Sequence, residues 1–207
     1  MYGHHINVAT PEDPATAREG ENIYQFLPRV LKQTAVSAWN IQQDMLQRRG
    51  LSVGSFQNAF WRYAAITVLI LLMSFMLGGW VGLLVLLVQA GVAVLLLEVV
   101  DYLEHYGLER RLQSNGRYEP TKPHHSWNAA HQASNWLLIN LQRHSDHHYK
   151  PQRRFPTLQS YPESEAPQLP YGYPWMVIIA LYPPLWFKLM NPPLERWKAQ
   201  FYPDSMA

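Results

Sequence analysis

The sequence contains no cysteine among its 207 residues. This absence excludes disulfide bonds, thiolate catalysis, zinc ribbons and protein-bound iron–sulfur clusters. Any metal must therefore be held by nitrogen and oxygen donors, a set that suits iron, zinc, copper or manganese. Neither sign of charge dominates, because 17 basic residues face 15 acidic ones. The composition therefore gives no indication of a nucleic-acid partner.

Charged residues are also absent from 64–97, where Leu, Val, Ile, Ala and Met predominate. This run is too long for one membrane span of about 20 residues but suits two, with Gly78-Gly79-Trp80 as the turn between them. The sequence therefore predicts an all-α, integral-membrane helical fragment with one transmembrane hairpin. Its arms are Phe60–Leu77 and Val81–Val99.

Cations flank this hairpin, and none lies in its turn. They are Arg48, Arg49 and Arg62 before the first arm and Arg110, Arg111, Arg117 and Lys122 after the second. By the positive-inside rule, both ends of the hairpin are cytoplasmic. The first fifty residues are polar, so we expect no signal peptide.

We predict a single membrane domain over residues 1–207. Residues 1–55 form a cytoplasmic loop and an amphipathic helix from about Asn22 to Arg49, and 60–99 form the hairpin. Residues 100–207 form a cytoplasmic cap that carries a histidine box and an interfacial C-terminal segment.

Within the cap, we expect a helix from about Trp127 to His148, after a turn at Asn115-Gly116. The later stretch Met176–Met190 is apolar, but it is interrupted by Pro183-Pro184 and is too short to span a bilayer. It predicts an interfacial or re-entrant segment with aromatic residues at the membrane surface.

The strongest metal-binding signal is a group of three histidines, His144, His147 and His148. On a helix they fall within an arc of about 100°, so their imidazoles can converge on one ion. The alternative is a polar helix end with incidental histidines. Asp146 points away from this arc and, with Arg143, is a candidate to support the ligands or to dock a partner.

A second group lies at the end of the second arm: Glu98, Asp101, Glu104 and His105. On a helix Glu98, Asp101 and His105 lie within about 60° of one another, with Glu104 to the side. Carboxylates beside a bilayer are costly without partners, which a metal or its histidine ligands would supply. The three acids are therefore candidates to support the ligands, the alternative being interfacial acids that face headgroups.

The other histidines give weaker signals. The pair His4-His5 alone could equally be a loop or the remnant of a tag. We interpret His124, His125 and His131 as structural residues or as supports for the metal ligands, because the first two follow Pro123 in a loop and His131 lies on another face of the expected helix.

Two segments, Asp101–Gly107 and Leu141–His148, resemble signature boxes of the membrane alkane 1-monooxygenases, bacterial relatives of the membrane fatty-acid desaturases. Shorter stretches also resemble this family, so the likeness covers nearly the whole chain. These stretches are Val8–Pro14, Asn115–Tyr118, Ser126–Asn128 and Pro183–Phe187.

The resemblance also implies which residues bind metal. The family pattern begins with a box of two histidines and continues with Glu-His, two residues and Gly-His-His, of which only Met1–His5 has a counterpart here. Three of the family's nine metal-binding histidines are therefore expected to be missing, and we expect a truncated chain that is inactive by itself. The ligands implied are His4, His5, His105, His144, His147 and His148.

The function implied by the resemblance is terminal hydroxylation of n-alkanes to primary alcohols. It implies two non-haem iron ions, dioxygen as co-substrate, and electrons from a rubredoxin fed by an NAD(P)H-dependent reductase. It also implies a multi-pass protein of the bacterial inner membrane, with its metal site on the cytoplasmic side. An alkane has no polar group, so it must be recognised by an apolar channel.

Three alternatives stay open at this point. The same irons could serve a membrane desaturase, or a fatty-acid or aryl-methyl hydroxylase. The chain could also be an inactive membrane fragment. Finally, Lys150, Arg153 and Arg154 could dock an acidic electron carrier, or could be ordinary cations at a headgroup surface.

Overall fold

The computed structural model describes residues 3–202. Over this range the chain is helical, and its only β-structure is two isolated bridges, Leu112 with Tyr118 and Asn128 with Gln168. The all-α prediction is confirmed. The chain divides into two compact units, one of residues 1–31 and 98–207 and the other of residues 32–97.

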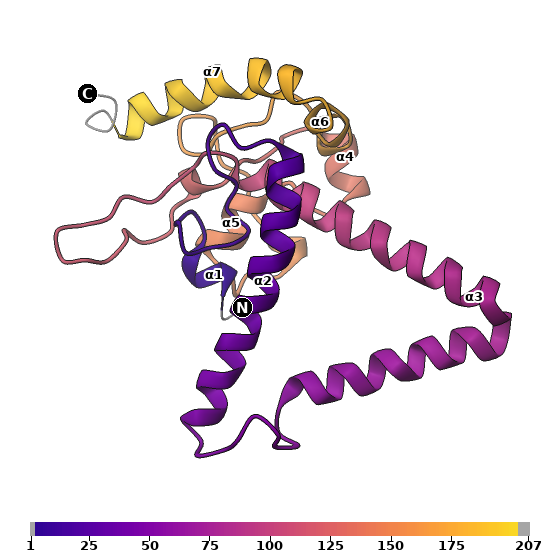
Figure 1. Cartoon of the computed structure of the whole chain (residues 1–207). Helices are drawn as coiled ribbons and strands as arrows, with labels where there is room; N and C mark the ends of the chain where they lie inside the picture. The colour runs from indigo at the N-terminus through magenta and orange to yellow at the C-terminus, as the bar shows by residue number, and fades with distance from the viewer. Residues whose placement is uncertain (1–2, 203–207) are drawn as a thin grey trace. The chain divides into compact units, whose positions relative to one another are not determined.

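The hairpin is a single long segment, α3 (Ala59–His105), that bends at Gly79 (Figure 1). Gly79 has φ 56° and ψ −147°, a conformation that only glycine adopts readily, which explains the bend where the turn is predicted. α3 is long and apolar enough to cross a membrane, and its most apolar window is only 11% buried. The second arm continues past the predicted end at Val99, so His105 is still helical.

The predicted amphipathic helix is confirmed as α2 (Ile23–Gln47). Its first turns bury Ile23, Phe26 and Val30, whose spacing places them on one face. The Phe26 ring lies 5.4 Å from the Tyr102 ring of α3. This contact joins the start of α2 to the end of α3 within the first unit.

The core of the first unit is built around Trp186 of α7 (Pro183–Phe201). Its ring lies 4.9 Å from that of Tyr102 and 5.3 Å from that of Tyr106. Gly107 then ends α3 with φ +69°, and a Cβ there would collide with Leu194 of α7. The two tyrosines and this glycine fix the helix end that carries His105.

The predicted helix Trp127–His148 is wrong. This stretch contains two short helices, α4 (Gln132–Leu137) and α5 (His144–Tyr149). Between them Ile139 and Asn140 have positive φ values of 53° and 65°, which a right-handed helix cannot accommodate.

Hydrogen bonds to residues far away in the sequence explain why no continuous helix forms here. The Trp127 N–H donates to the Glu104 carbonyl and the Asn128 N–H to the Pro167 carbonyl, so both are unavailable to a helix. His131 precedes α4 as its exposed N-cap residue, so its position relative to His144 is not set by one helix. Apolar periodicity cannot reveal such contacts between segments far apart in the sequence.

The C-terminal apolar stretch forms two helices, α6 (Tyr173–Ala180) and α7, which break where Pro183-Pro184 predicts an interruption. α6 buries Tyr173, Met176 and Ala180. The remaining short helices are α1 (His4–Asn7) and the 3-10 turns η1 (Pro123–His125) and η2 (Phe155–Thr157).

Candidate metal centre

Four histidines from three separate elements meet in the first unit. His4 of α1, His105 at the end of α3, and His144 and His148 of α5 each bring a ring nitrogen within 4.8 Å of the others. The Nε2 atoms are 3.0 Å apart in His105 and His144, 2.8 Å in His144 and His148, and 3.2 Å in His148 and His4. We call these four residues the histidine cluster.

Hydrogen bonds alone cannot satisfy the histidine cluster. His144 Nε2 faces both His105 and His148, and His148 Nε2 faces both His144 and His4. A nitrogen of a neutral imidazole carries either one hydrogen or one lone pair, so it cannot donate to one neighbour and accept from the other. Four inward-facing lone pairs would be satisfied by a cation, so the donor set fits a metal ion.

His5 and His147 lie beside the cluster. Their ring centroids are 4.7 Å apart, and the His5 ring is 4.9 Å from that of His148. His147 lies 5.4 Å from His148 by the same measure. The structure therefore brings all six histidines that the sequence singles out into one neighbourhood.

The surroundings keep most of these imidazoles neutral, which is the form that binds metal. Burial lowers the pKa of His144, His147 and His148. Burial and the neighbouring His147 lower the pKa of His5 to about 4. His4 differs: burial alone would lower its pKa, but the hydrogen bond and charge of Asp13 outweigh burial and raise it.

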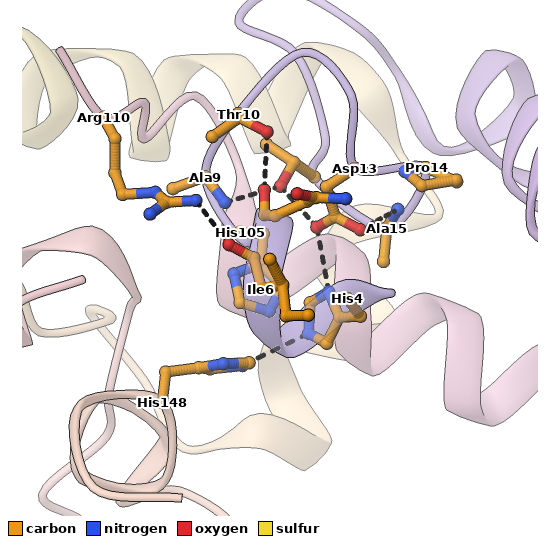
Figure 2. Close-up of polar contacts among 12 residues, drawn as sticks. His4, Ile6, Ala9, Thr10, Asp13, Pro14, Ala15, His105, Arg110 and His148 are labelled. Atoms are coloured by element: carbon orange, nitrogen blue, oxygen red, sulfur yellow. Dashed lines mark hydrogen bonds and ion pairs between the residues drawn. The ribbon is translucent and has the colours of Figure 1, made fainter. Parts of the chain in front are cut away.

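Asp13 is a functional candidate that sequence reasoning missed. His4 Nδ1 donates to Asp13 Oδ2 at 2.8 Å, on the side of the ring opposite the contact with His148 (Figure 2). Asp13 is buried and also accepts from the Thr16 hydroxyl and the Ala15 N–H. The carboxylate thereby holds the hydrogen of His4 on Nδ1 and leaves the Nε2 lone pair for the cluster. Only the fold of the loop after His4 brings the two residues together.

Of the three acids on α3, Glu104 makes the firmest contacts. It is buried, accepts a hydrogen bond from the Tyr173 hydroxyl at 3.0 Å, and lies 3.2 Å from His144 Nδ1 without hydrogen-bond alignment. Asp101 forms a close group with Glu104 and His105. Glu98 has one buried oxygen without a hydrogen-bond partner among the described residues.

Asp146 faces away from the cluster, as the helical spacing predicts. It accepts two bonds from Arg153 Nη1, at 2.8 and 2.7 Å, one from the Gln159 N–H and one from the Tyr161 hydroxyl. The carboxylate therefore fixes the loop after α5. The cation paired with Asp146 is Arg153 and not Arg143, which donates to the Leu158 carbonyl. Because Arg153 is held by Asp146, it is a poor member of the predicted docking patch.

A second group, Glu119, His124 and His125, also lies close enough to suggest a metal site. However, the Lys122 N–H donates to His125 Nδ1 at 3.0 Å, which places the hydrogen of neutral His125 on Nε2. That N–H points at the Tyr202 oxygen at 2.7 Å, and the Tyr202 hydroxyl donates to Glu119. His125 thus has no lone pair to offer, and its hydrogen bonds support the structural interpretation.

Comparison with known proteins identifies the class. Residues 2–180 match the family model of the fatty acid desaturases, so the chain belongs to this family. Within it, alkane 1-monooxygenases 1 and 2 of Pseudomonas aeruginosa are 45% and 44% identical to the chain, over 96% of its length and 52% of theirs. The hydroxylase component XylM of a Pseudomonas putida xylene/toluene monooxygenase is 31% identical over the same shares.

The chain spans about half the length of the curated relatives that it matches. The family and the exposed apolar arms of α3 together indicate a membrane protein.

Proposed function

We propose that the whole protein hydroxylates the terminal carbon of n-alkanes to primary alcohols, using dioxygen at a histidine-ligated di-iron centre. The observation that carries this proposal is the convergence of the six histidines in a chain 44–45% identical to alkane 1-monooxygenases. The proposed metal ligands are His4, His5, His105, His144, His147 and His148.

When bound, iron would supply the activation of dioxygen, the oxidant that attack on a terminal C–H bond requires. The residues of this chain would hold and shield it. His105, His144 and His148 are buried and offer neutral nitrogens, while Asp13 orients His4. Burial also keeps bulk water away from the centre. The alkane offers no polar group, so its binding would depend on apolar surroundings and on its partition into the bilayer.

We also propose electron-transfer partners and a cellular location. Electrons would come from a rubredoxin and its NAD(P)H-dependent reductase, and the site would lie on the cytoplasmic side of a bacterial inner membrane. The cations around the hairpin support this orientation, because none lies in its turn.

The test is a substrate panel. Membranes that contain the full-length protein, an electron-donor system and dioxygen would be supplied separately with n-octane, a fatty acyl substrate and p-xylene. We expect 1-octanol from the octane sample. Turnover of another substrate without any octanol would contradict the proposal.

A second candidate is hydroxylation of an aryl methyl group. The likeness to XylM supports it, as does a cluster that does not itself discriminate between substrates. Because the chain belongs to the fatty acid desaturase family, a membrane desaturase and a fatty-acid hydroxylase are further candidates. In the same panel, a benzylic alcohol from xylene or a desaturated acyl product, with no octanol, would favour these candidates.

A third proposal concerns the 207-residue chain by itself, which we expect to be inactive. Four histidines surround one position, but only His5 and His147 are left to define a second. Because affinity rises with the number of donors, the chain should hold well under two irons. Iron content of the purified chain measures this, and a value near two per chain would contradict it.

A further inference from the structure

Helix α6 is apolar on both of its faces. No charged or hydrogen-bonding side chain occurs from Met176 to Leu181, and the buried face already supplies Met176 and Ala180 to the core. On the other face, Trp175 and Ile178 are 66% and 58% exposed. A helix with this pattern requires an apolar environment on its outer side as well.

A second set of exposed apolar side chains surrounds the loop between α4 and α5. Trp136, Leu137 and Ile139 are 70%, 73% and 63% exposed, and Phe155 adds another exposed ring. Ile139 has positive φ, an unusual conformation for a β-branched residue, which the rest of the loop must stabilise.

Asn140 holds this loop in shape. Its side-chain amide donates to the Phe155 carbonyl at 3.2 Å, and its oxygen accepts from Asn135 at 2.7 Å. These bonds join the loop to η2, so Ile139 and Phe155 belong to neighbouring segments. The apolar side chains are therefore displayed by a fixed backbone.

The two sets meet at Gln142. Its side-chain oxygen accepts from the Ser134 hydroxyl of α4 and from the Tyr173 N–H of α6, both at 3.0 Å. Gly172 lies so close to Ser134 that a Cβ would not fit, and α4 and α6 appear next to each other in Figure 1. We call the combined set the apolar surface; it consists of Trp136, Leu137, Ile139, Phe155, Trp175 and Ile178.

Two exposed cations lie in the segment that carries Phe155 of the apolar surface. Asp146 is the only acid from 120 to 162, and it is paired with Arg153. The two exposed cations are Lys150 and Arg154; the next acids along the chain, the exposed Glu163 and Glu165, lie in the loop before α6. Tryptophans beside cations are typical of protein surfaces at the headgroup level of anionic membranes.

We propose that the apolar surface rests in the headgroup region of a bilayer that contains anionic lipids. This contact is separate from the apolar arms of α3 and does not depend on metal chemistry. One consequence rests on the proposed function. Ile139 of the apolar surface precedes His144 by five residues, so molecules dissolved in the lipid would reach the chain close to the histidine cluster.

Spin labels test the proposal cleanly, because the chain has no native cysteine. A nitroxide would be attached to single-cysteine variants in vesicles of phosphatidylcholine mixed with phosphatidylglycerol. The variants are Leu137→Cys, Ile139→Cys and Ile178→Cys. Electron paramagnetic resonance would compare collisions with oxygen, which concentrates in lipid, and with a water-soluble nickel chelate. Leu84→Cys in the hairpin is the lipid control, and Asn115→Cys at an exposed turn is the water control.

At the three test positions we expect an oxygen-to-nickel ratio several-fold above that of Asn115→Cys and approaching that of Leu84→Cys. A ratio equal to that of Asn115→Cys would overturn the proposal. Low accessibility to both reagents would also overturn it, because another protein surface would then cover these residues.

A charge variant tests the headgroup part separately. The double change Lys150→Gln and Arg154→Gln should lower the ratio at Ile139→Cys in the mixed vesicles and leave it unchanged in pure phosphatidylcholine. An unchanged ratio in both lipids would overturn the role of anionic headgroups.

Discussion

Helices α5 and α1 both bring histidines to the cluster, but different forces hold them. In α5, His144 and His148 are buried, and Asp146 on the opposite face fixes the following loop through Arg153. The four-residue α1 has no buried residue, and the His4 side chain is 27% exposed. The His4 ring is oriented by its hydrogen bond to Asp13, and the Ile6 carbonyl of α1 accepts a hydrogen bond from Arg110.

This difference indicates how each donor is prepared for a metal. In α5 the backbone and the packing fix the rings before any ion arrives, so little ordering remains to be done on binding. In α1 a single buried carboxylate performs the same task for His4. We therefore expect the cluster to tolerate changes around α1 better than the loss of an α5 donor.

The largest effect should follow from His144→Ala. His144 Nε2 lies 3.0 Å from His105 Nε2 and 2.8 Å from His148 Nε2, so its loss removes an inner member of the donor set. Affinity of the purified chain for Co²⁺, measured from the ligand-field absorption, should fall by more than the ~10–100-fold typical of a change behind the ligands.

The matched control is His131→Ala, which removes an exposed histidine outside the cluster. It should bind Co²⁺ as the parent chain does. Equal losses in the two variants would mean that binding is unspecific and that the cluster is not the site.

A second prediction concerns the support of α5. In Asp146→Asn, the new amide group would face donors from Arg153, Gln159 and Tyr161, and the charge of Arg153 would lose its partner. The free energy of unfolding should fall by about 1.5–3 kcal/mol. Denaturant unfolding in detergent micelles, followed by tryptophan fluorescence, measures this change.

Glu163→Gln is the control, since it neutralises an exposed acid outside this network. Unfolding of Asp146→Asn at the same denaturant concentration as this control would show that the loop after α5 is held by other contacts. The contrast between α5 and α1 would then lose its basis.

The same contrast explains which features the sequence could reveal. The spacing of His144, His147 and His148 describes one turn of helix, so local geometry is enough to group them. The hairpin is equally local, because an uncharged apolar run and a glycine pair define it. The end of α3 at Gly107 depends instead on a close approach to Leu194, which no local pattern shows.

Spacing along the chain does not predict features that depend on contacts between residues far apart in the sequence. The expected helix Trp127–His148 fails because Trp127 and Asn128 bond to distant carbonyls and Asn140 adopts a left-handed conformation. Helical spacing places Glu104 to the side of the face that carries Asp101 and His105, and from this position it meets Tyr173 and His144. Asp13 lies in the turn-forming stretch Thr10–Pro14, and only the folded loop brings it to His4.

The smallest predicted effect tests that missed residue. Asp13→Asn keeps the shape of the side chain but removes the charge that holds the hydrogen of His4 on Nδ1. Co²⁺ affinity should fall by ~10–100-fold, less than in His144→Ala, because His4 stays in place but is less strongly oriented. The control Glu12→Gln neutralises the adjacent, exposed acid and should have no effect. A loss in Asp13→Asn as large as that in His144→Ala would mean that α1 is as essential to the cluster as α5, which would end the distinction drawn between them.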